Sequence, residues 1–360
     1  MKLILGSSSK WRRQVMLEAG LACDLMSPDI DEKAIRHTDP ETLVRLISKA
    51  KSEALRGHVH EDALIITADQ VVDYEGSIRE KPESKEESRI FLESYSERSV
   101  DTVSGVGVYN TKNNRYVEGF DRVTIEFNKI PEDVIAALVE EEQTQQTAGG
   151  FSIEHPLLQP YVREIRGSVD SVWGLPMLLV KRLMEEVLME ELTVLSDVED
   201  ERGKEFEYFH RKAARAVLFD EEGHIPLLYV KKYDYYKLPG GGLEGSEDMH
   251  EALIREVMEE VGATCAITHP IGMIREYRKE YKMYQDSYCF LGTVLEKGSP
   301  QFTEKELEEG FELQWLSPKE ALEKFATLPE NYQGRFIVER DRVFLEKAMK
   351  MKENIHNLYK

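Results

Sequence analysis

Short apolar runs alternate along this chain with longer stretches in which apolar residues recur every three or four positions. The first pattern is typical of buried strands, and the second is typical of helices that bury one face. Residues 3–5 and 63–68 are therefore predicted as buried strands, and residues 10–20 as a helix that ends at a glycine. Asp69 and Gln70 follow the second strand, at the carboxyl end where open α/β sheets place their chemistry.

The same patterns predict further elements in both halves of the chain. Helices are predicted over residues 41–55, 86–94, 131–142, 177–191, 246–262, 318–325 and 339–351. Strands are predicted over residues 102–109, 116–127, 213–219, 226–231, 273–277, 286–295 and 311–316. Because strands and helices alternate throughout, the expected fold class is α/β or α+β.

A change in composition near the middle of the chain predicts the domain boundary. Between residues 185 and 207, ten acidic residues stand against only two basic ones. Such a stretch is typical of a solvated segment, so residues 192–207 are predicted to be an exposed acidic linker. With 360 residues, 41% of them hydrophobic, the chain is long enough for two cores. We expect one domain over residues 1–191 and a second over residues 208–360.

Net charge and cysteine content limit the classes of partner. The formal net charge of −21 argues against binding to nucleic acid polymers and against a basic membrane anchor, but it does not exclude nucleotides as substrates. The amino terminus has only a short apolar run, and no segment approaches the length of a membrane span, so neither a signal peptide nor a membrane helix is expected. Cys23, Cys265 and Cys289 are far apart in sequence, which predicts free thiols in a reducing cytoplasm.

The helix predicted over residues 246–262 carries a group of carboxylates. Ser246 is predicted to cap this helix and Gly262 to end it. Three apolar residues fall within about 80° of one another on a helix and form a core face: Leu253, Val257 and Val261. Three acidic residues are expected on the opposite side, within about 100° of one another: Glu256, Glu259 and Glu260. Their mutual repulsion would be relieved by Mg²⁺ or Mn²⁺, and a solvated acidic face is the alternative.

The spacing around these carboxylates resembles the Nudix box at every fixed position. The fixed residues are Gly241, Glu247, Arg255-Glu256, Glu259-Glu260 and Gly262-Ala263. The resemblance implies a Nudix α/β/α sandwich that cleaves a phosphoanhydride in a nucleoside diphosphate linked to another moiety, using metal-activated water. It also implies that the three carboxylates hold the cation, with Glu259 and Glu260 as catalytic residues. Gly241, Glu247 and Arg255 would support these carboxylates from behind.

Two features of the second half stay open on the sequence. A general base outside the box has four candidates: Glu304, Glu306, Glu308 and Glu309. Residues 233–236 and 275–288 supply aromatic and basic side chains that either hold a nucleotide base or belong to the core and surface. The substrate of this half is therefore not specified.

The first half begins with a pattern typical of an anion site. A strand, the loop over residues 6–9 and a helix that opens with Arg12 and Arg13 direct backbone N–H groups and two guanidinium groups toward one point. An ordinary capped helix with surface arginines is the alternative. Asp69 is a charge within an apolar run, and such a position usually needs a partner, a metal or a catalytic role.

Several short segments of the first half, taken in order, resemble the Maf family of nucleoside triphosphate pyrophosphatases. They read LGSSSKWRR (5–13), DE (31–32), ISKAK (47–51), TADQV (67–71), KP (81–82), AG (148–149) and GLP (174–176). The resemblance covers about residues 1–190 and implies a mixed α/β sheet in two lobes, with the nucleotide in the cleft between them and often a homodimer.

The Maf resemblance also implies roles for individual residues. Asp69 would activate water as a general base or through a metal, and Glu32 would assist that metal, Mg²⁺ or Mn²⁺. Five residues would bind the triphosphate: Ser7, Arg12, Arg13, Lys51 and Lys81. When a nucleophile attacks a polyphosphate, cationic groups are needed to neutralise its negative charge.

Three positions bear on the nucleotide base, namely Trp11, Gln70 and Glu154. The commoner Maf pattern has Arg, Thr and Gln there, and the combination in this chain resembles the subgroup that prefers 7-methyl-GTP over dTTP and UTP. N7-methylguanine carries a positive charge, which the face of an indole attracts. A carboxylate at position 154 can accept the N1–H and N2–H of guanine, which a pyrimidine does not offer.

The function expected from the sequence is that of a bifunctional nucleotide pyrophosphohydrolase. The first half would convert 7-methyl-GTP into the monophosphate and pyrophosphate, and the second would hydrolyse a nucleoside diphosphate derivative. Action of the first half on dTTP and UTP is one alternative. A second alternative is that one half senses nucleotides and regulates the other.

Overall fold

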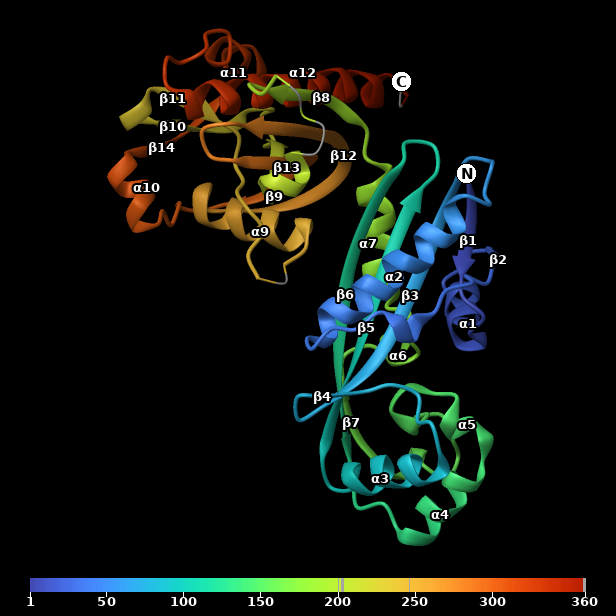
Figure 1. The fold of residues 1–360 in the computed structure, drawn as a ribbon. Helices are drawn as coiled ribbons and strands as arrows, with labels where there is room; N and C mark the ends of the chain where they lie inside the picture. The colour runs from blue at the N-terminus through green and yellow to red at the C-terminus, as the bar shows by residue number, and fades with distance from the viewer. Residues whose placement is uncertain (200, 202–203, 246, 359–360) are drawn as a thin grey trace. The chain divides into compact units, whose positions relative to one another are not determined.

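The computed structural model describes residues 1–199, 201, 204–245 and 247–358 (Figure 1). The chain divides into two compact units, one over Met1–Leu188 and one that begins at Met189. Each unit has its own sheets and its own buried apolar clusters. The expectation of a two-domain chain of mixed α and β structure is therefore confirmed.

A seven-stranded mixed sheet forms the centre of the first unit. Its strands are β1 (Lys2–Gly6), β2 (Asp24–Leu25), β3 (Ala63–Tyr74), β4 (Ser77–Arg79), β5 (Ser99–Asn110), β6 (Arg115–Phe127) and β7 (Val162–Arg166). The order is β2-β1-β3-β5-β6-β7, and β4 pairs with β3 outside this order. β1 is parallel to β2 and β3, whereas the pairs β3–β5, β5–β6 and β6–β7 are antiparallel.

The helices of the first unit cover both faces of this sheet. They are α1 (Lys10–Glu18), α2 (Pro40–Arg56), α3 (Lys85–Tyr95), α4 (Glu132–Glu140), α5 (Glu142–Gln145), α6 (Val169–Val172) and α7 (Met177–Leu188). Three short 3-10 turns are η1 (Glu32–Ala34), η2 (Ala148–Gly150) and η3 (Gln159–Tyr161). Val103 of β5 packs with Val44 of α2, and Val106 packs with Val180 of α7. Because odd and even residues of a strand point to opposite faces, α2 and α7 lie on opposite sides.

Close contact between α2 and β5 sets the position of Lys51 relative to the sheet. A side chain at Gly105 would place its Cβ 2.6 Å from the backbone of Val44, so only glycine allows this approach. Ser48 of α2 donates from its hydroxyl to the carbonyl of Gly105 at 3.0 Å. Lys51 lies about one helical turn after Ser48 and therefore on the same side of α2, facing the sheet.

The strands β3, β5 and β6 continue into a second lobe, where they pack against α3 and α4 (Figure 1). Buried residues of this lobe include Val72 on β3, Leu92 on α3, Phe127 on β6 and Leu138 on α4. The first unit thus has the two-lobed mixed sheet that the Maf resemblance implies.

The second unit contains two sheets. Their strands are β8 (Glu191–Ser196), β9 (Phe209–Phe219), β10 (Ile225–Val230), β11 (Tyr235–Lys237), β12 (Ala263–Arg278), β13 (Met283–Lys297) and β14 (Phe311–Leu316). The four-stranded sheet has the order β8-β12-β13-β9, and the three-stranded sheet has the order β11-β10-β14. β12 and β13 form a long antiparallel hairpin, and β9 is parallel to β13.

The helices of the second unit are α8 (Lys204–Glu207), α9 (Met249–Glu260), α10 (Glu304–Glu309), α11 (Pro318–Lys324) and α12 (Tyr332–Leu358), with the 3-10 turn η4 (Lys231–Tyr233). Of these, α9 and α12 cover opposite faces of the four-stranded sheet. Leu253 of α9 packs with Ala214 and Tyr288 on one face, while Phe344 of α12 packs with Val217 on the other. This is the sandwich implied by the Nudix resemblance. No helix within the described residues combines the length and the apolar character that crossing a membrane requires.

The predicted linker was partly wrong. Residues 191–196 form β8, which pairs in parallel with β12, and residues 204–207 form α8. Leu195 is buried and packs with Val217, and Leu192 packs against the same cluster. The prediction relied on the number of acidic residues across the whole stretch. It did not weigh the apolar residues Leu192 and Leu195, which attach the strand to the core. The boundary between the compact units falls after Leu188.

The position of Asp69 also differs from the expectation. β3 does not end at Ala68 but continues to Tyr74, with Val71 and Val72 buried. Asp69 is therefore a residue within a central strand, and its carboxylate leaves the sheet toward α2 rather than from a loop at the strand end.

Asp286 of β13 gives the second unit a pH-dependent stability. Its carboxylate accepts a hydrogen bond from Arg275 Nε at 2.7 Å and lies 3.1 Å from His210 Nε2. Burial raises the pKa of Asp286, but these two partners outweigh burial and hold the pKa at about 2. Because an unfolded aspartate titrates near 3.9, this contribution is complete above about pH 5 and is lost as the pH falls toward 2.

We therefore expect Asp286→Asn to lower the free energy of unfolding by about 2 to 3 kcal/mol near neutral pH. The difference between the variant and the wild type should shrink as the pH is lowered from about 5 to about 2.5. Thermal melting across this pH range measures it. A difference that stays constant over the whole range would contradict the prediction.

Candidate active sites

Lys51, Asp69 and Glu32 come together in the first unit from three elements. Lys51 lies on α2, Asp69 on β3, and Glu32 opens the turn η1. The ammonium of Lys51 is 2.8 Å from Asp69 Oδ1 and 3.0 Å from Glu32 Oε1, and it donates to the carbonyl of Ala68 at 3.2 Å. Lys51 and Asp69 are 5% and 8% exposed, so this ion pair is shielded from water. Two carboxylates thus converge on a single cationic point.

Arg12 of α1 joins this cluster from the other side. Its Nε donates to the carbonyl of Gly174 at 2.9 Å, and its terminal N–H donates to the carbonyl of Ala68 at 2.6 Å. Burial lowers the pKa of Arg12, and the charges of Asp69 and Glu32 partly offset this effect. The guanidinium therefore links the first helix, the strand β3 and the segment before α7 at one place.

The other predicted phosphate-binding residues of this half divide into two groups. Ser7 is buried, and its hydroxyl accepts from the backbone N–H of Ser9 at 3.2 Å and from Arg12 at 3.5 Å. Arg13 is exposed, and its charge acts on Cys23, lowering a thiol pKa that burial raises more. Lys81 is exposed, and no ion pair joins it to the cluster within the described part of the chain. The structure therefore brings Ser7 to the cluster but not Arg13 or Lys81.

Trp173 connects the residues predicted to select the base, and the sequence reasoning missed it. The rings of Trp11 and Trp173 are tilted by 32° with centroids 5.4 Å apart. The indole N–H of Trp173 donates to Glu154 Oε1, and Ser152 donates to the other oxygen at 2.9 Å. Trp11 and Glu154 therefore both contact the side chain of Trp173. An aromatic residue directly before the Gly174-Leu-Pro176 segment is the sequence signal that points to it.

Gln70 holds the segment that carries Trp173. Its amide nitrogen lies 3.0 Å from the Ser104 hydroxyl and 3.0 Å from the carbonyls of Ser171 and Val172. The amide N–H groups are therefore used within the protein. The geometry gives Gln70 a positioning role toward Trp173, because Val172 is the residue before it.

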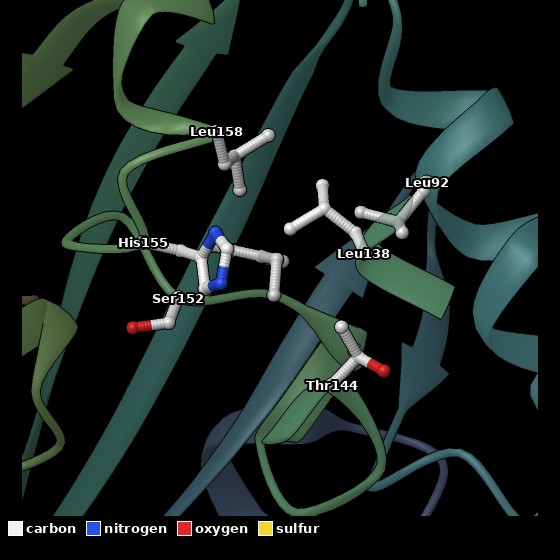
Figure 2. Close-up of a pocket in the computed structure, with 8 residues that line it drawn as sticks. Leu92, Leu138, Thr144, Ser152, His155 and Leu158 are labelled. Carbon is white, nitrogen blue, oxygen red and sulfur yellow. The ribbon is translucent and has the colours of Figure 1, made fainter. Parts of the chain in front are cut away.

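The second lobe contains a small pocket, and Ser152, which donates to Glu154, is one of the residues that line it (Figure 2). Its lining is mostly apolar and includes Leu92, Leu138, Phe151, His155 and Leu158. The imidazole of His155 lies 2.8 Å from Glu141. No lysine or arginine lines the pocket, so it does not suit a triphosphate.

The helix α9 of the second unit begins with a capping box. Asp248 is the N-cap, and its carboxylate accepts from the backbone N–H groups of His250 at 2.7 Å and Glu251 at 3.0 Å. Glu251 in turn accepts from the N–H of Asp248 at 3.0 Å. Ser246, which the sequence predicted as the cap, lies outside the described residues. Asp248 is the N-cap because its carboxylate accepts from the N–H of Glu251, while the carboxylate of Glu251 accepts from the N–H of Asp248.

Arg255 connects the carboxylates of the box. It donates to both oxygens of Glu247, at 2.8 and 3.0 Å, and to the carbonyl of Gly242 at 3.1 Å. One of its terminal nitrogens lies 3.0 Å from Glu256 and 3.2 Å from Glu259. Arg255 therefore contacts Glu247, Glu256 and Glu259, and the resemblance implies these contacts. Gly241 lies against the Glu256 carboxylate, which leaves no room there for a side chain.

Glu260 does not lie where the sequence placed it. We expected it on the face opposite Leu253 and Val257, but it is 1% exposed and points into the unit beside this core face. Lys237 Nζ lies 2.5 Å from one oxygen, and the N–H of Gly240 donates to the other at 2.7 Å. Burial raises the pKa of Glu260 to about 7, against the opposing effect of Lys237. Its position at the edge of the apolar stripe explains the burial.

The chemistry of these carboxylates fits a hard divalent cation in each unit. In the first unit, Asp69 and Glu32 face one point, where the Lys51 ammonium provides the positive charge. In the second unit, Glu256 and Glu259 both accept from one terminal nitrogen of Arg255. Carboxylate oxygens are the ligands that Mg²⁺ and Mn²⁺ prefer. Nudix and Maf hydrolases generally use divalent metals.

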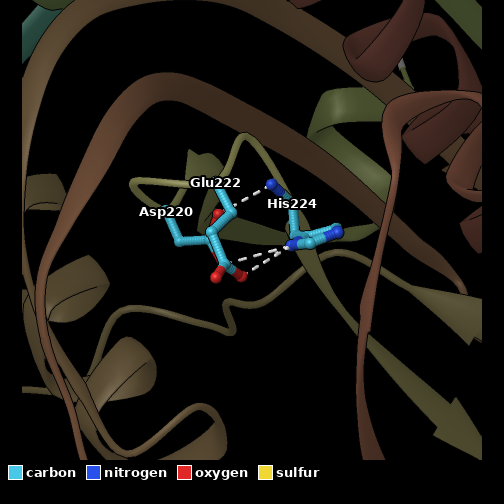
Figure 3. Close-up of side chains that lie close together, drawn as sticks. All are labelled: Asp220, Glu222 and His224. Carbon is cyan, nitrogen blue, oxygen red and sulfur yellow. Dashed lines mark hydrogen bonds and ion pairs between the residues drawn. The ribbon is translucent and has the colours of Figure 1, made fainter.

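A different acidic group lies in the turn between β9 and β10 (Figure 3). Asp220, Glu222 and His224 form the one group, within the described ranges, whose possible ligand atoms all lie within 4.8 Å. Asp220 already accepts from Lys297 at 2.6 Å and from the backbone N–H of His224 at 2.7 Å. The group is therefore explained as a turn whose charge Lys297 balances.

The features left open in the second half are partly explained. Glu306 completes the capping box of α10, because its carboxylate accepts from the backbone N–H and the hydroxyl of Thr303 at 2.8 and 2.9 Å. Glu304, Glu308 and Glu309 are then left as candidate bases. In the two aromatic segments, Tyr235, Tyr277 and Tyr288 are buried, so the core interpretation is confirmed for them.

Comparison with known proteins assigns a family description to each half of the chain. A family model described as Maf-like protein matches residues 2–187, and one described as NUDIX domain matches residues 209–335. The chain is 41% identical over 192 residues to a protein named 7-methyl-GTP pyrophosphatase from Dictyostelium discoideum, which covers 51% of this chain and 96% of that relative.

Two bacterial relatives match the same half. A protein named 7-methyl-GTP pyrophosphatase from Idiomarina loihiensis is 34% identical over 153 residues, covering 42% of this chain and 77% of the relative. A protein named dTTP/UTP pyrophosphatase from Clostridium botulinum is 29% identical over 189 residues, covering 52% of this chain and 100% of the relative.

Proposed function

Because the chain belongs to the Maf-like family and also carries a NUDIX domain, we propose that it is a bifunctional nucleotide pyrophosphohydrolase with one active site in each unit. The first unit hydrolyses a nucleoside triphosphate, with 7-methyl-GTP as the preferred substrate. The second unit hydrolyses a nucleoside diphosphate derivative. The observation that carries the proposal is the buried cluster of Lys51, Asp69 and Glu32 beside Arg12.

In the first unit, the oxygen of water bonds to the α-phosphorus while the bond to the β-phosphate breaks, so pyrophosphate leaves. Asp69 accepts the proton of the attacking water. Arg12 and Lys51 neutralise the charge that develops on the phosphate oxygens. A divalent cation, when bound near Asp69 and Glu32, supplies a water of lowered pKa.

Selectivity for 7-methylguanine rests on Trp11 and Glu154. The positively charged base stacks on the indole of Trp11, which attracts a cation through its π face. Glu154 accepts the N1–H and N2–H groups of the base, and Trp173 and Ser152 hold its carboxylate in place. Two of the three relatives described above carry the name 7-methyl-GTP pyrophosphatase, and the most similar of them supports this base.

Replacing Trp11 with alanine is expected to lower kcat/KM for 7-methyl-GTP, relative to dTTP, by about 3- to 30-fold, since a cation–π contact contributes about 0.5 to 2 kcal/mol. Leu17→Ala is the matched control, because Leu17 is 54% exposed on the same helix. Kinetics with both nucleotides measure the ratio. If the wild-type enzyme prefers dTTP, or if the ratio is the same in both variants, the assignment of the base is wrong.

Two alternatives have specific support. Action on dTTP and UTP is favoured by the Clostridium botulinum relative, and the same kinetic comparison tests it. A purely regulatory role for one half requires that this half has lost its catalytic activity. The cluster around Asp69 and the intact box carboxylates with Arg255 argue against that loss.

In the second unit, Glu256, Glu259 and Glu260 are proposed to hold the cation, with Glu259 and Glu260 serving catalysis. Arg255, paired with Glu247, fixes the positions of Glu256 and Glu259, and Gly241 lies against Glu256. Lys237 and Gly240 hold the Glu260 carboxylate, so Glu260 would exchange part of this contact for the metal.

The remaining assignments concern the cell and the assembly. We assign Mg²⁺ or Mn²⁺ to both units on the carboxylate chemistry. The three free cysteines support a reducing cytoplasm. A homodimer through the first unit and the lack of binding to nucleic acid polymers remain predictions from the sequence.

A further inference from the structure

Four arginines gather inside the second unit, between its four-stranded sheet and α12. Arg211 and Arg215 lie on β9, Arg278 is the last residue of β12, and Arg340 lies on α12. Arg215, Arg278 and Arg340 are 5%, 5% and 1% exposed, while Arg211 is half-buried. Arginine is rarely buried unless it is paired, so this arginine cluster needs a physical explanation.

Every carboxylate and amide oxygen within the arginine cluster already accepts at least one hydrogen bond. Glu276 accepts from Arg278 at 2.6 Å, from Gln285 at 2.7 Å, from Ser287 at 2.9 Å and from Arg340 at 3.4 Å. Asp341 accepts from Arg340 at 2.7 Å and from the backbone N–H of Leu238 at 2.8 Å. The side-chain carbonyl of Gln285 accepts from Arg211.

The donors, in contrast, are not all in use. Arg215 Nε, Arg278 Nε and the second terminal nitrogen of Arg340 are buried and have no hydrogen-bond partner among the residues that the structure describes. Buried polar groups in native proteins are nearly always paired. Three buried guanidinium nitrogens without a hydrogen-bond partner favour a ligand that offers acceptors.

The net charge of the arginine cluster also favours an anionic ligand. The arginine cluster contains four guanidinium groups, and the carboxylates in contact with it are Glu276 and Asp341, which leaves an excess of two positive charges. Burial and the neighbouring Arg340 lower the pKa of Arg215 to about 10. Burial, followed by Arg340 and Arg278, also lowers the pKa of Arg211. An anion would balance this charge.

The arginine cluster lies directly behind the loop that leads into the box. Arg215 donates to the carbonyl of Gly241 at 3.1 Å and to that of Ala214 at 2.9 Å. A Cβ at Gly242 would lie 2.6 Å from a terminal nitrogen of Arg211, whereas Gly241 faces the carboxylate of Glu256. One stretch of backbone therefore separates the guanidinium groups from the carboxylates proposed to hold the cation.

We propose that this arginine cluster binds a phosphate group of the nucleotide hydrolysed by the second unit. The proposal rests on the hydrolase function proposed for that unit, and it narrows the substrate to one that places a phosphate behind the Gly240–Gly242 loop. Phosphate oxygens accept hydrogen bonds and do not donate them when ionised, which matches the three unused donors. Half-buried Arg211 marks the side from which the anion reaches the cluster.

Hydrogen exchange of the full chain with and without inorganic phosphate tests this proposal without requiring catalysis. At about ten times its dissociation constant, phosphate should slow exchange about tenfold in peptides that cover residues 274–287 and 238–242. Sodium chloride at the same ionic strength should not. The Glu259→Gln variant should show the same protection, so a failure of the hydrolase function remains distinguishable from a failure of this proposal.

Arg278→Gln is the decisive variant, because Arg278 lies at the end of a strand and its loss removes one unused donor. It should lose the phosphate protection while exchange in peptides of the first unit stays unchanged, and Arg278→Lys should retain part of it. AMP that protects at lower concentration than inorganic phosphate supports a nucleotide phosphate, whereas equal concentrations would overturn the assignment to a nucleotide. Absence of protection in the wild type, equal protection by chloride, or full protection in Arg278→Gln would overturn the proposal.

Discussion

Asp69→Asn is expected to lower kcat for pyrophosphate release from 7-methyl-GTP by about 10²- to 10⁴-fold, the usual contribution of a general base. The amide has nearly the same shape but cannot accept the proton of the attacking water. It also leaves the buried ammonium of Lys51 with Glu32 as its remaining carboxylate partner. Because Lys51 still donates to the carbonyl of Ala68, the strand and α2 should keep their positions.

The matched control for this variant is Asp73→Asn, four residues along the same strand. Asp73 pairs with Arg122 at 2.9 Å and is therefore also a charged partner in an ion pair, but it lies outside the cluster. Its kcat should stay within about twofold of the wild type. Equal rates in wild type and Asp69→Asn would show that another group activates the water.

Glu259→Gln is expected to lower hydrolysis by the second unit by about 10²- to 10⁴-fold at low Mg²⁺. Its side chain is 38% exposed and, like Glu256, accepts from one terminal nitrogen of Arg255, so the substitution removes a charged ligand without opening a cavity. Part of the loss should be recovered at high Mg²⁺, because fewer charged ligands weaken the affinity for the cation.

The control for the second unit is Glu323→Gln, an exposed glutamate on α11 that lies outside the box. A panel of nucleotide sugars, dinucleoside polyphosphates and modified nucleotides, assayed with both variants, measures the effect and identifies the substrate. If Glu259→Gln matches the control on every compound that the wild type cleaves, the second unit is not the source of that hydrolysis.

The sequence predicted the features that depend on local spacing. The box helix, the apolar face of Leu253, Val257 and Val261, and the pairing of Arg255 with Glu247 all follow from residues close together in the chain. The strands β5, β6 and β14 also lie where alternation placed them, within a few residues. In these segments, local pattern and tertiary packing agree.

Features that depend on distant partners were missed. Trp173 gains its place from Trp11 and Glu154, which lie far away in the sequence. Glu260 lies at the edge of the apolar stripe, but the partners that hold its buried carboxylate, Lys237 and Gly240, lie outside the helix. The arginine cluster combines residues of β9, β12 and α12, and as single residues these arginines resemble surface charges. Only the fold shows which charges are removed from water together.

We propose that the chain contains two independent hydrolytic sites, the first of which acts on 7-methyl-GTP. The most direct test measures pyrophosphate release from 7-methyl-GTP by two full-length variants under identical conditions. Glu259→Gln should keep the wild-type rate within about twofold, while Asp69→Asn should lose it. Loss of activity in Glu259→Gln, or retention in Asp69→Asn, would contradict the account.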